Sequence, residues 1–125
     1  MKKLLYIGIC VLSIGGFFRV VQAETKISII KYITDTANII PDDVEQRLET
    51  ALAGFQAQTT NQIAVVTIPK LQSDETIETA AYNIFNANKL GTKEKRNGVL
   101  FLISLDDRKT KIETGYDVEP ILPDI

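Results

Sequence analysis

Two apolar segments separated by a helical pattern limit the folds open to this chain. Residues 62–68 are almost entirely apolar and β-branched, and residues 99–105 are again apolar apart from Ser104. Runs of this length are typical of strands covered on both faces. A helical stripe lies between them, formed by Ile77, Ala80, Ala81, Ile84 and Phe85. Strand, helix and buried strand in this order predict a right-handed parallel crossover.

The flanking residues extend this unit in both directions. An earlier helix is predicted by the apolar stripe Val44, Leu48, Ala51, Leu52 and Phe55. Before this helix, residues 32–34 are expected to form a short strand that leads Asp35 into a loop. The second helix, which lies between the two apolar segments, is expected to start at Ser73 or Asp74. After residue 105, a polar turn precedes the alternating residues 111–114, which predicts an antiparallel hairpin. We therefore expect an α/β fold, a small αβα sandwich with a mixed sheet, one parallel βαβ crossover and an edge hairpin.

The first 23 residues have the three-part pattern of a cleavable signal peptide. Lys2 and Lys3 precede an apolar stretch over residues 4–18, and Val21-Gln22-Ala23 is a small-residue cleavage signature. Arg19 ends the apolar run below the roughly 20 residues that span a bilayer. We expect cleavage after Ala23, a loose lead-in over residues 24–31, a domain over residues 32–125, and no transmembrane span in the mature chain.

Charge and composition exclude several classes of function. The signal segment holds three of the 14 basic residues and none of the 16 acidic ones, so the mature chain carries a net charge of −5. We therefore expect no nucleic-acid partner. The chain has no His, and its single Cys lies in the signal segment. Ser-His-Asp and Cys-His catalysis, imidazole or thiolate zinc sites and disulfides are excluded from the mature domain.

Three separated motifs, taken together, resemble one known family. They are Ile33-Thr34-Asp35, the strand around residues 61–67, and residues 91–119 with Asn97-Gly98-Val99-Leu100, Asp107-Arg108 and Thr114-Gly115-Tyr116-Asp117-Val118-Glu119. The chain is similar to the TPM domain, a family that includes thylakoid lumen and photosystem-associated proteins and exported bacterial proteins of the YgcG type. The resemblance implies an α/β sandwich outside the cytoplasm, with divalent cation binding in some members and acid phosphatase activity in others.

The chain departs from this family pattern in two respects. Family members usually continue for several tens of residues past the equivalent of Asp124, often to a transmembrane helix, so the domain is expected to lack its last elements. If the chain is a fragment of such a protein, the domain is tethered to the membrane. The family also commonly has Gly where this chain has Asp117.

Oxygen-bearing side chains in the predicted loops are the candidates for a site. Asp35, Asn97, Glu119 and Asp124 are placed at strand ends, where open α/β sheets usually bind ligands, and their oxygens suit calcium or magnesium. The structural alternative is that Asp35 closes a turn, Asn97 starts an Asn-Gly turn, and Glu119 and Asp124 are solvated.

Three further residues are candidates for binding an anion or a partner. Arg108 and Lys95 carry the charge for a phosphate or carboxylate. Tyr116 belongs to the family-like Gly-Tyr pattern, whereas Tyr82 is expected at the rim of the core. Residues 93–96 form a charged run that either steers an anion or is a solvated loop.

Two functions agree with these residues. One is a cation-binding interaction or assembly module of the cell envelope, periplasmic or extracellular, that holds a partner protein. The other is a metal-supported acid phosphatase acting on small phosphoesters. The module is preferred because the sequence supplies no recognised nucleophile and base.

Overall fold

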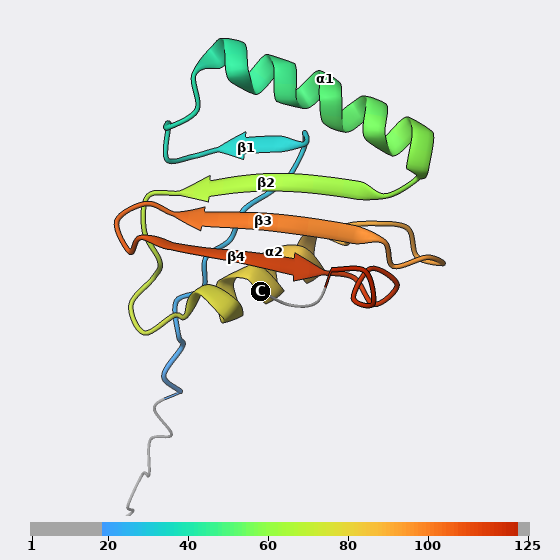
Figure 1. The fold of residues 1–125 in the computed structure, drawn as a ribbon. Helices are drawn as coiled ribbons and strands as arrows, with labels where there is room; N and C mark the ends of the chain where they lie inside the picture. Colours follow the sequence, from blue (N-terminus) through green and yellow to red (C-terminus); the bar gives the residue numbers. More distant parts are fainter. Residues whose placement is uncertain (1–18, 123–125) are drawn as a thin grey trace, which may run out of the picture.

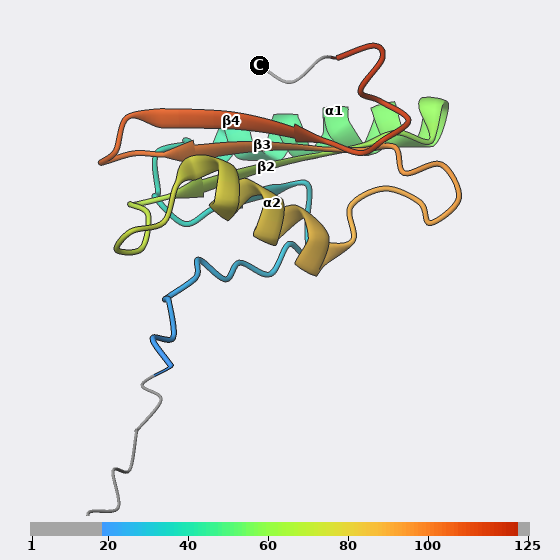
Figure 2. The same ribbon diagram turned by 90° about the horizontal axis from the view of Figure 1, so that it is seen from below.

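The structure, a computed structural model, describes residues 19–122 and shows a four-stranded sheet between two helices (Figures 1 and 2). The strand order is β1-β2-β3-β4; the first three strands are parallel, and β4 is antiparallel to β3. The elements are β1 (Ile33–Asp35), α1 (Asp42–Thr59), β2 (Gln62–Ile68), α2 (Ile77–Asn88), β3 (Gly98–Ser104) and β4 (Lys109–Thr114). The predicted mixed sheet, parallel crossover and edge hairpin are confirmed, and β1-α1-β2 forms a second parallel crossover.

The core lies between the sheet and α2. Alternate residues of β2 and β3 point to this face, because successive side chains of a strand point to opposite sides. They meet the apolar stripe of α2, and each member of this cluster is at most 7% exposed. The cluster contains Ala64, Val66, Ile68, Leu71, Ile77, Ala80, Ala81, Ile84, Leu90, Leu100 and Leu102. The start of α2 differs from the prediction, because the hydroxyl of Thr76 accepts from the N–H of Thr79 and Thr76 is the residue that caps the helix.

The opposite face is covered less completely. Helix α1 lies over β1 and β2 and has no fully buried residue; Leu48 and Phe55 remain 36% and 38% exposed. Within residues 19–122, no helix covers β3 and β4 on this side (Figure 2). No helix in this part of the chain is long and apolar enough to cross a membrane.

The lead-in before β1 is irregular but fastened to α2, which differs from the loose segment expected. The Asn88 side chain accepts from the N–H of Ile29 and donates to the carbonyl oxygen of Ile27, both at 2.8 Å. Ile27 and Ile29 pack against the core cluster. Figure 2 shows this segment, in blue, approaching α2 before it reaches β1. The ordered contacts of the domain therefore begin before residue 32.

Candidate functional site

Asp35 lies at the carboxyl end of β1, and its carboxylate is enclosed by donors of neighbouring segments. Its two oxygens accept from the N–H groups of Ile39 at 3.2 Å and Ile40 at 2.8 Å, and the hydroxyl of Thr67 also donates to it. Burial by itself raises the pKa of Asp35, but the hydrogen bonds from Thr67, Ile40 and Ile39 outweigh it and hold the pKa below its usual value. The carboxylate thus closes the turn after β1.

Asn97 lies just before β3 and is only 3% exposed. Its amide nitrogen donates to the carbonyl oxygen of Thr60 at 2.8 Å and to the side-chain oxygen of Asn61 at 3.1 Å. Its amide oxygen accepts from the N–H of Thr92 at 3.0 Å. The side chain ties the loop before β3 to the turn between α1 and β2, and its oxygen faces donors of the protein.

Asp35 and Asn97 lie at opposite edges of the sheet. Asp35 pairs with Thr67 near the carboxyl end of β2, whereas Gly98, which follows Asn97, pairs with Gln62 at the amino end. The two positions on β2 are separated by about 16 Å of extended strand. Asp35 and Asn97 therefore cannot share one cation.

Glu119 follows β4 and lies at the amino edge, because Thr114 at the end of β4 pairs with Val99. Asp124 lies outside the described residues. Among residues 19–122, no three His, Cys, Asp or Glu side chains are grouped closely enough to hold a metal ion. Asp35 thus does not share a calcium or magnesium ion with Asn97 or Glu119.

The two cationic candidates are separated as well. Arg108 is exposed in the hairpin turn between β3 and β4, with a left-handed backbone at φ 53°. The neighbouring Asp107 accepts from the Ser104 hydroxyl at 2.6 Å and the Leu71 N–H at 2.7 Å, which lower the pKa of its carboxyl group. Lys95 lies in the loop before β3, at the other edge, where its Nζ donates to the Thr60 hydroxyl at 3.2 Å. Arg108 and Lys95 therefore do not bind one anion together.

Tyr116 and Glu119, in contrast, line one open hollow of about 800 Å³ at the amino edge of the sheet. The hollow lies between the end of α2, the loop that follows it and the end of β4. Three cations share it, namely Lys89, Lys93 and Arg96. We call it the basic hollow; its other main lining residues are Tyr82, Phe85, Leu90 and Glu113.

A glycine positions the charged loop in the basic hollow. A Cβ atom added to Gly115 would lie 2.0 Å from the carbonyl oxygen of Arg96, so only glycine permits this approach. The next residue, Tyr116, receives the guanidinium of Arg96 over its ring, 4.5 Å from the centroid. This is the geometry of a cation–π contact, which holds the arginine at the wall of the hollow.

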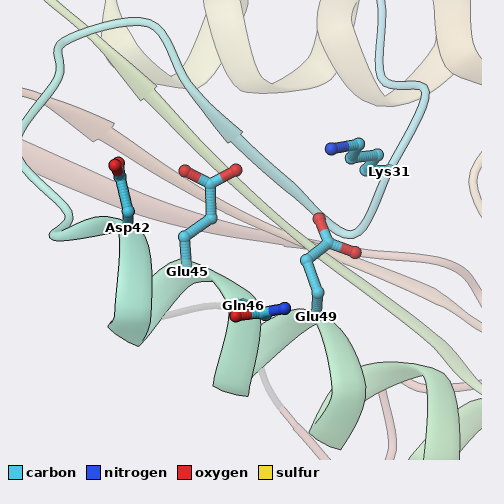
Figure 3. Close-up of a pocket in the computed structure, with 5 residues that line it drawn as sticks. All are labelled: Lys31, Asp42, Glu45, Gln46 and Glu49. Atoms are coloured by element: carbon cyan, nitrogen blue, oxygen red, sulfur yellow. The ribbon is translucent and has the colours of Figure 1, made fainter.

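A second hollow, of about 450 Å³, lies between α1 and the segment that enters β1. Figure 3 shows Asp42, Glu45 and Glu49 on α1, with Lys31 on the other side. Glu49 accepts from the N–H of Tyr32 at 3.2 Å and from that of Ile33 at 2.7 Å. Asp42 and Glu45 lie in the first turn of α1, where negative charge complements the helix dipole. These carboxylates therefore have structural roles.

Comparisons with known proteins decide the family. The model of the TPM domain matches residues 33–125. This chain belongs to the TPM domain family. One similar solved structure is the N-terminal domain of a P. gingivalis protein, determined by NMR. It is 29% identical in sequence and has a TM-score of 0.68; the match covers 75% of this chain and 59% of that chain. No curated protein matches the chain.

A second solved structure resembles this TPM domain in its fold. It is the N-terminal domain of the cg2496 protein from Corynebacterium glutamicum, also an NMR structure. Its TM-score is 0.59 at 20% identity, and the match covers 76% of this chain and 60% of that chain. The present chain thus spans about three fifths of either solved structure.

Sequence reasoning missed Lys89 and Arg96 as individual site residues of this TPM domain. The sequence identifies residues 93–96 only as a charged run, either a source of steering charge or a solvated loop. Tyr82, which is 60% exposed, lies at the rim as predicted. Lys89 follows directly after α2 in a left-handed conformation, φ 49°, which brings it to the same hollow. The available signal was the cluster of Lys and Arg between the end of a helix and a buried strand.

Proposed function

We propose that this chain is an exported protein of the cell envelope whose TPM domain is an interaction or assembly module, receiving an acidic group of its partner in the basic hollow. The observation that carries the proposal is the stack of Arg96 on Tyr116, with Lys89 and Lys93 lining the same hollow. A guanidinium fixed in this way binds a carboxylate or phosphate through two parallel hydrogen bonds. The cost of ordering the side chain is reduced because the ring already holds it.

Export is supported by the signal-peptide pattern of residues 1–23. The destination is the periplasm or the outside of the cell. If the chain is part of a longer protein with a later membrane span, the domain stays tethered at that side of the membrane. Either arrangement leaves the basic hollow facing extracytoplasmic partners.

A second candidate is a phosphatase acting on small phosphoesters. It is favoured by Glu119, whose side chain lines the same hollow as the three cations. The cations would hold the phosphate. The Glu119 carboxylate would take a proton from the water that attacks phosphorus and pass it to the alkoxide that leaves as the ester P–O bond breaks. Asp35 lies at the other edge of the sheet from Asn97 and Glu119, and no step is assigned to a metal. The module remains our choice because the hollow brings together charge and apolar surface without an evident nucleophile.

Binding and turnover distinguish these two functions. Inorganic phosphate and a blocked Gly-Glu-Glu-Gly peptide are titrated into the chain beginning at Glu24, followed by calorimetry. We expect Arg96→Ala to weaken binding by about fivefold or more, which corresponds to ~1 kcal/mol. Arg108→Ala is the matched control, since Arg108 is exposed at the opposite edge, and it should leave binding within about twofold.

Hydrolysis of para-nitrophenyl phosphate is then measured from acidic to neutral pH, with and without calcium or magnesium. Binding without turnover supports the module. Turnover that is lost in Glu119→Gln supports the phosphatase. Two results contradict the assignment of the basic hollow. Either the unmodified chain neither binds nor hydrolyses these probes, or the Arg96→Ala variant binds them as tightly as the unmodified chain does.

A further inference from the structure

At the predicted cleavage point, the chain changes from exposed residues to residues that contact the rest of the domain. The described residues 19–24 are all exposed, whereas Thr25 is only 7% exposed. From Thr25 onward the lead-in is held against α2 and the loop before it. The bond between Ala23 and Glu24 therefore lies in accessible chain, one residue before the fastened part.

Glu75 is the residue that fastens this point. Its two carboxylate oxygens accept from the N–H of Thr25 at 3.1 and 3.2 Å, and the hydroxyl of Thr25 donates to one of them. The same carboxylate lies 3.4 Å from the N–H of Gln72, which donates to it. Glu75 thus joins the lead-in to the loop that precedes α2.

A small hollow of about 90 Å³ separates the cleavage point from this loop. Ala23 and Glu24 are among its lining residues, and so are Asp74 and Glu75 of the loop. The nitrogen of Glu24 is one residue before that of Thr25, which is about 3.5 Å along an extended chain. In the uncut chain this nitrogen is a neutral amide; after cleavage it is an ammonium group beside the hollow that Asp74 and Glu75 line.

We infer that cleavage between Ala23 and Glu24 creates an N-terminal ammonium group that pairs with Asp74 and Glu75 and locks the lead-in onto α2. The charged side chains next to this point along the chain are those of Glu24 itself and Lys26, both exposed. Acidic groups predominate, so a new positive charge is favourable there. Because the lead-in places Ile27 and Ile29 against the core, the lock stabilises the domain only after processing.

The first test is the mass of the exported product. The full chain is expressed in a bacterial host with its own leader, and the mature protein is analysed by intact mass spectrometry. We expect it to begin at Glu24. A product that begins elsewhere, or retention of the leader, overturns the assigned cleavage point.

The second test isolates the ammonium group. The chain from Glu24 is prepared with a free or an acetylated N-terminus, and the two forms are compared by thermal unfolding. We expect acetylation to lower Tm by about 2–5 °C, the range for a partly exposed ion pair in a domain of this size. In Asp74→Asn and in Glu75→Gln this difference should shrink, and in Glu78→Gln, on the exposed side of α2, it should persist.

Equal Tm values for the free and acetylated chains overturn the lock, as does an undiminished difference in both Asp74→Asn and Glu75→Gln. Asp74→Asn leaves the bonds between Glu75 and Thr25 in place, so it tests the pairing even if Glu75→Gln fails to fold. The result is independent of anion binding in the basic hollow, which lies at the other end of α2.

Discussion

The hydroxyl of Thr67 donates to the carboxylate of Asp35 and joins the ends of β1 and β2. The same carboxylate holds the turn after β1 through the N–H groups of Ile39 and Ile40. β1 is only three residues long, so few ladder hydrogen bonds hold it in the sheet. Asp35 therefore has a structural task that depends on its ionisation.

We expect Asp35→Asn to reduce stability at neutral pH by about 1–2 kcal/mol, because hydrogen bonds to a charged acceptor are weakened. The pKa of Asp35 is lowered in the folded state, so its contribution is present above the unfolded pKa of about 3.9 and is lost as the pH falls through the folded value. Urea unfolding across acidic to neutral pH should show the two proteins converging at low pH. Asp43→Asn, on the exposed face of α1, is the control and should change stability by less than ~0.5 kcal/mol.

The layered fold was predictable because its signals are local. Largely apolar runs identified β2 and β3, and helical spacing identified α1 and α2. The residue that caps α2 was not predictable. Ser73, Asp74 and Thr76 are all chemically suitable caps, and only the path of the loop selects Thr76. The anchoring of the lead-in by Asn88 depends on a contact 59 residues apart in sequence, which no local pattern reveals.

The arrangement of the candidate site residues was only partly predictable, and the reason is topological. Asn97 precedes a parallel strand, so it had to lie at the amino edge, whereas Asp35 follows one and lies at the carboxyl edge. The antiparallel direction of β4 then returns Tyr116 and Glu119 to the edge of Asn97. The contact of Tyr116 with Arg96 further requires the close backbone approach at Gly115, which depends on tertiary packing.

Replacing Asn97 by Ala should destabilise the domain by about 2–3 kcal/mol. The change leaves the carbonyl oxygen of Thr60, the side-chain oxygen of Asn61 and the N–H of Thr92 without their hydrogen bonds to the buried Asn97 side chain. Chemical unfolding followed by circular dichroism measures the loss. Asn86→Ala is a suitable comparison, because Asn86 is exposed and bonds only within α2; equal losses in the two variants would contradict the role of Asn97.

Replacing Asn88 by Ala should release the lead-in while α2 remains folded. The variant removes the bonds to the N–H of Ile29 and the carbonyl oxygen of Ile27. We expect the amide proton of Ile29 to exchange with solvent at least about tenfold faster, since each lost bond is worth ~1 kcal/mol. Amide exchange followed by NMR checks this. Unchanged protection of Ile29 would show that apolar packing alone holds the segment.

The ring of Tyr116, rather than its hydroxyl, should support anion binding. Tyr116→Phe keeps the face on which Arg96 lies, whereas Tyr116→Ala removes it. We expect phosphate affinity to fall by about threefold in Tyr116→Ala, since exposed cation–π contacts contribute ~0.5–1 kcal/mol, and to change little in Tyr116→Phe. Calorimetric titration measures both. An equal loss in the two variants would assign the effect to the hydroxyl.

Glu49 protects the outer edge of the sheet, and its removal should cause both destabilisation and self-association. β1 is an edge strand, and the carboxylate of Glu49 accepts from the N–H groups of Tyr32 and Ile33. In Glu49→Ala these donors are free to pair with another chain, as exposed strand edges do. We expect a loss of about 1–2 kcal/mol, measured by urea unfolding, and a larger mean mass in light scattering at high protein concentration.

Glu45→Ala is the matched control for this edge, because Glu45 lines the same hollow one turn earlier on α1. It removes the same charge, so any effect of net charge on association appears in both variants. Glu49→Gln keeps one acceptor oxygen and should lie between Glu49→Ala and the unmodified chain. If Glu45→Ala associates as strongly as Glu49→Ala, electrostatic repulsion, and not the covered backbone of β1, keeps the chains apart.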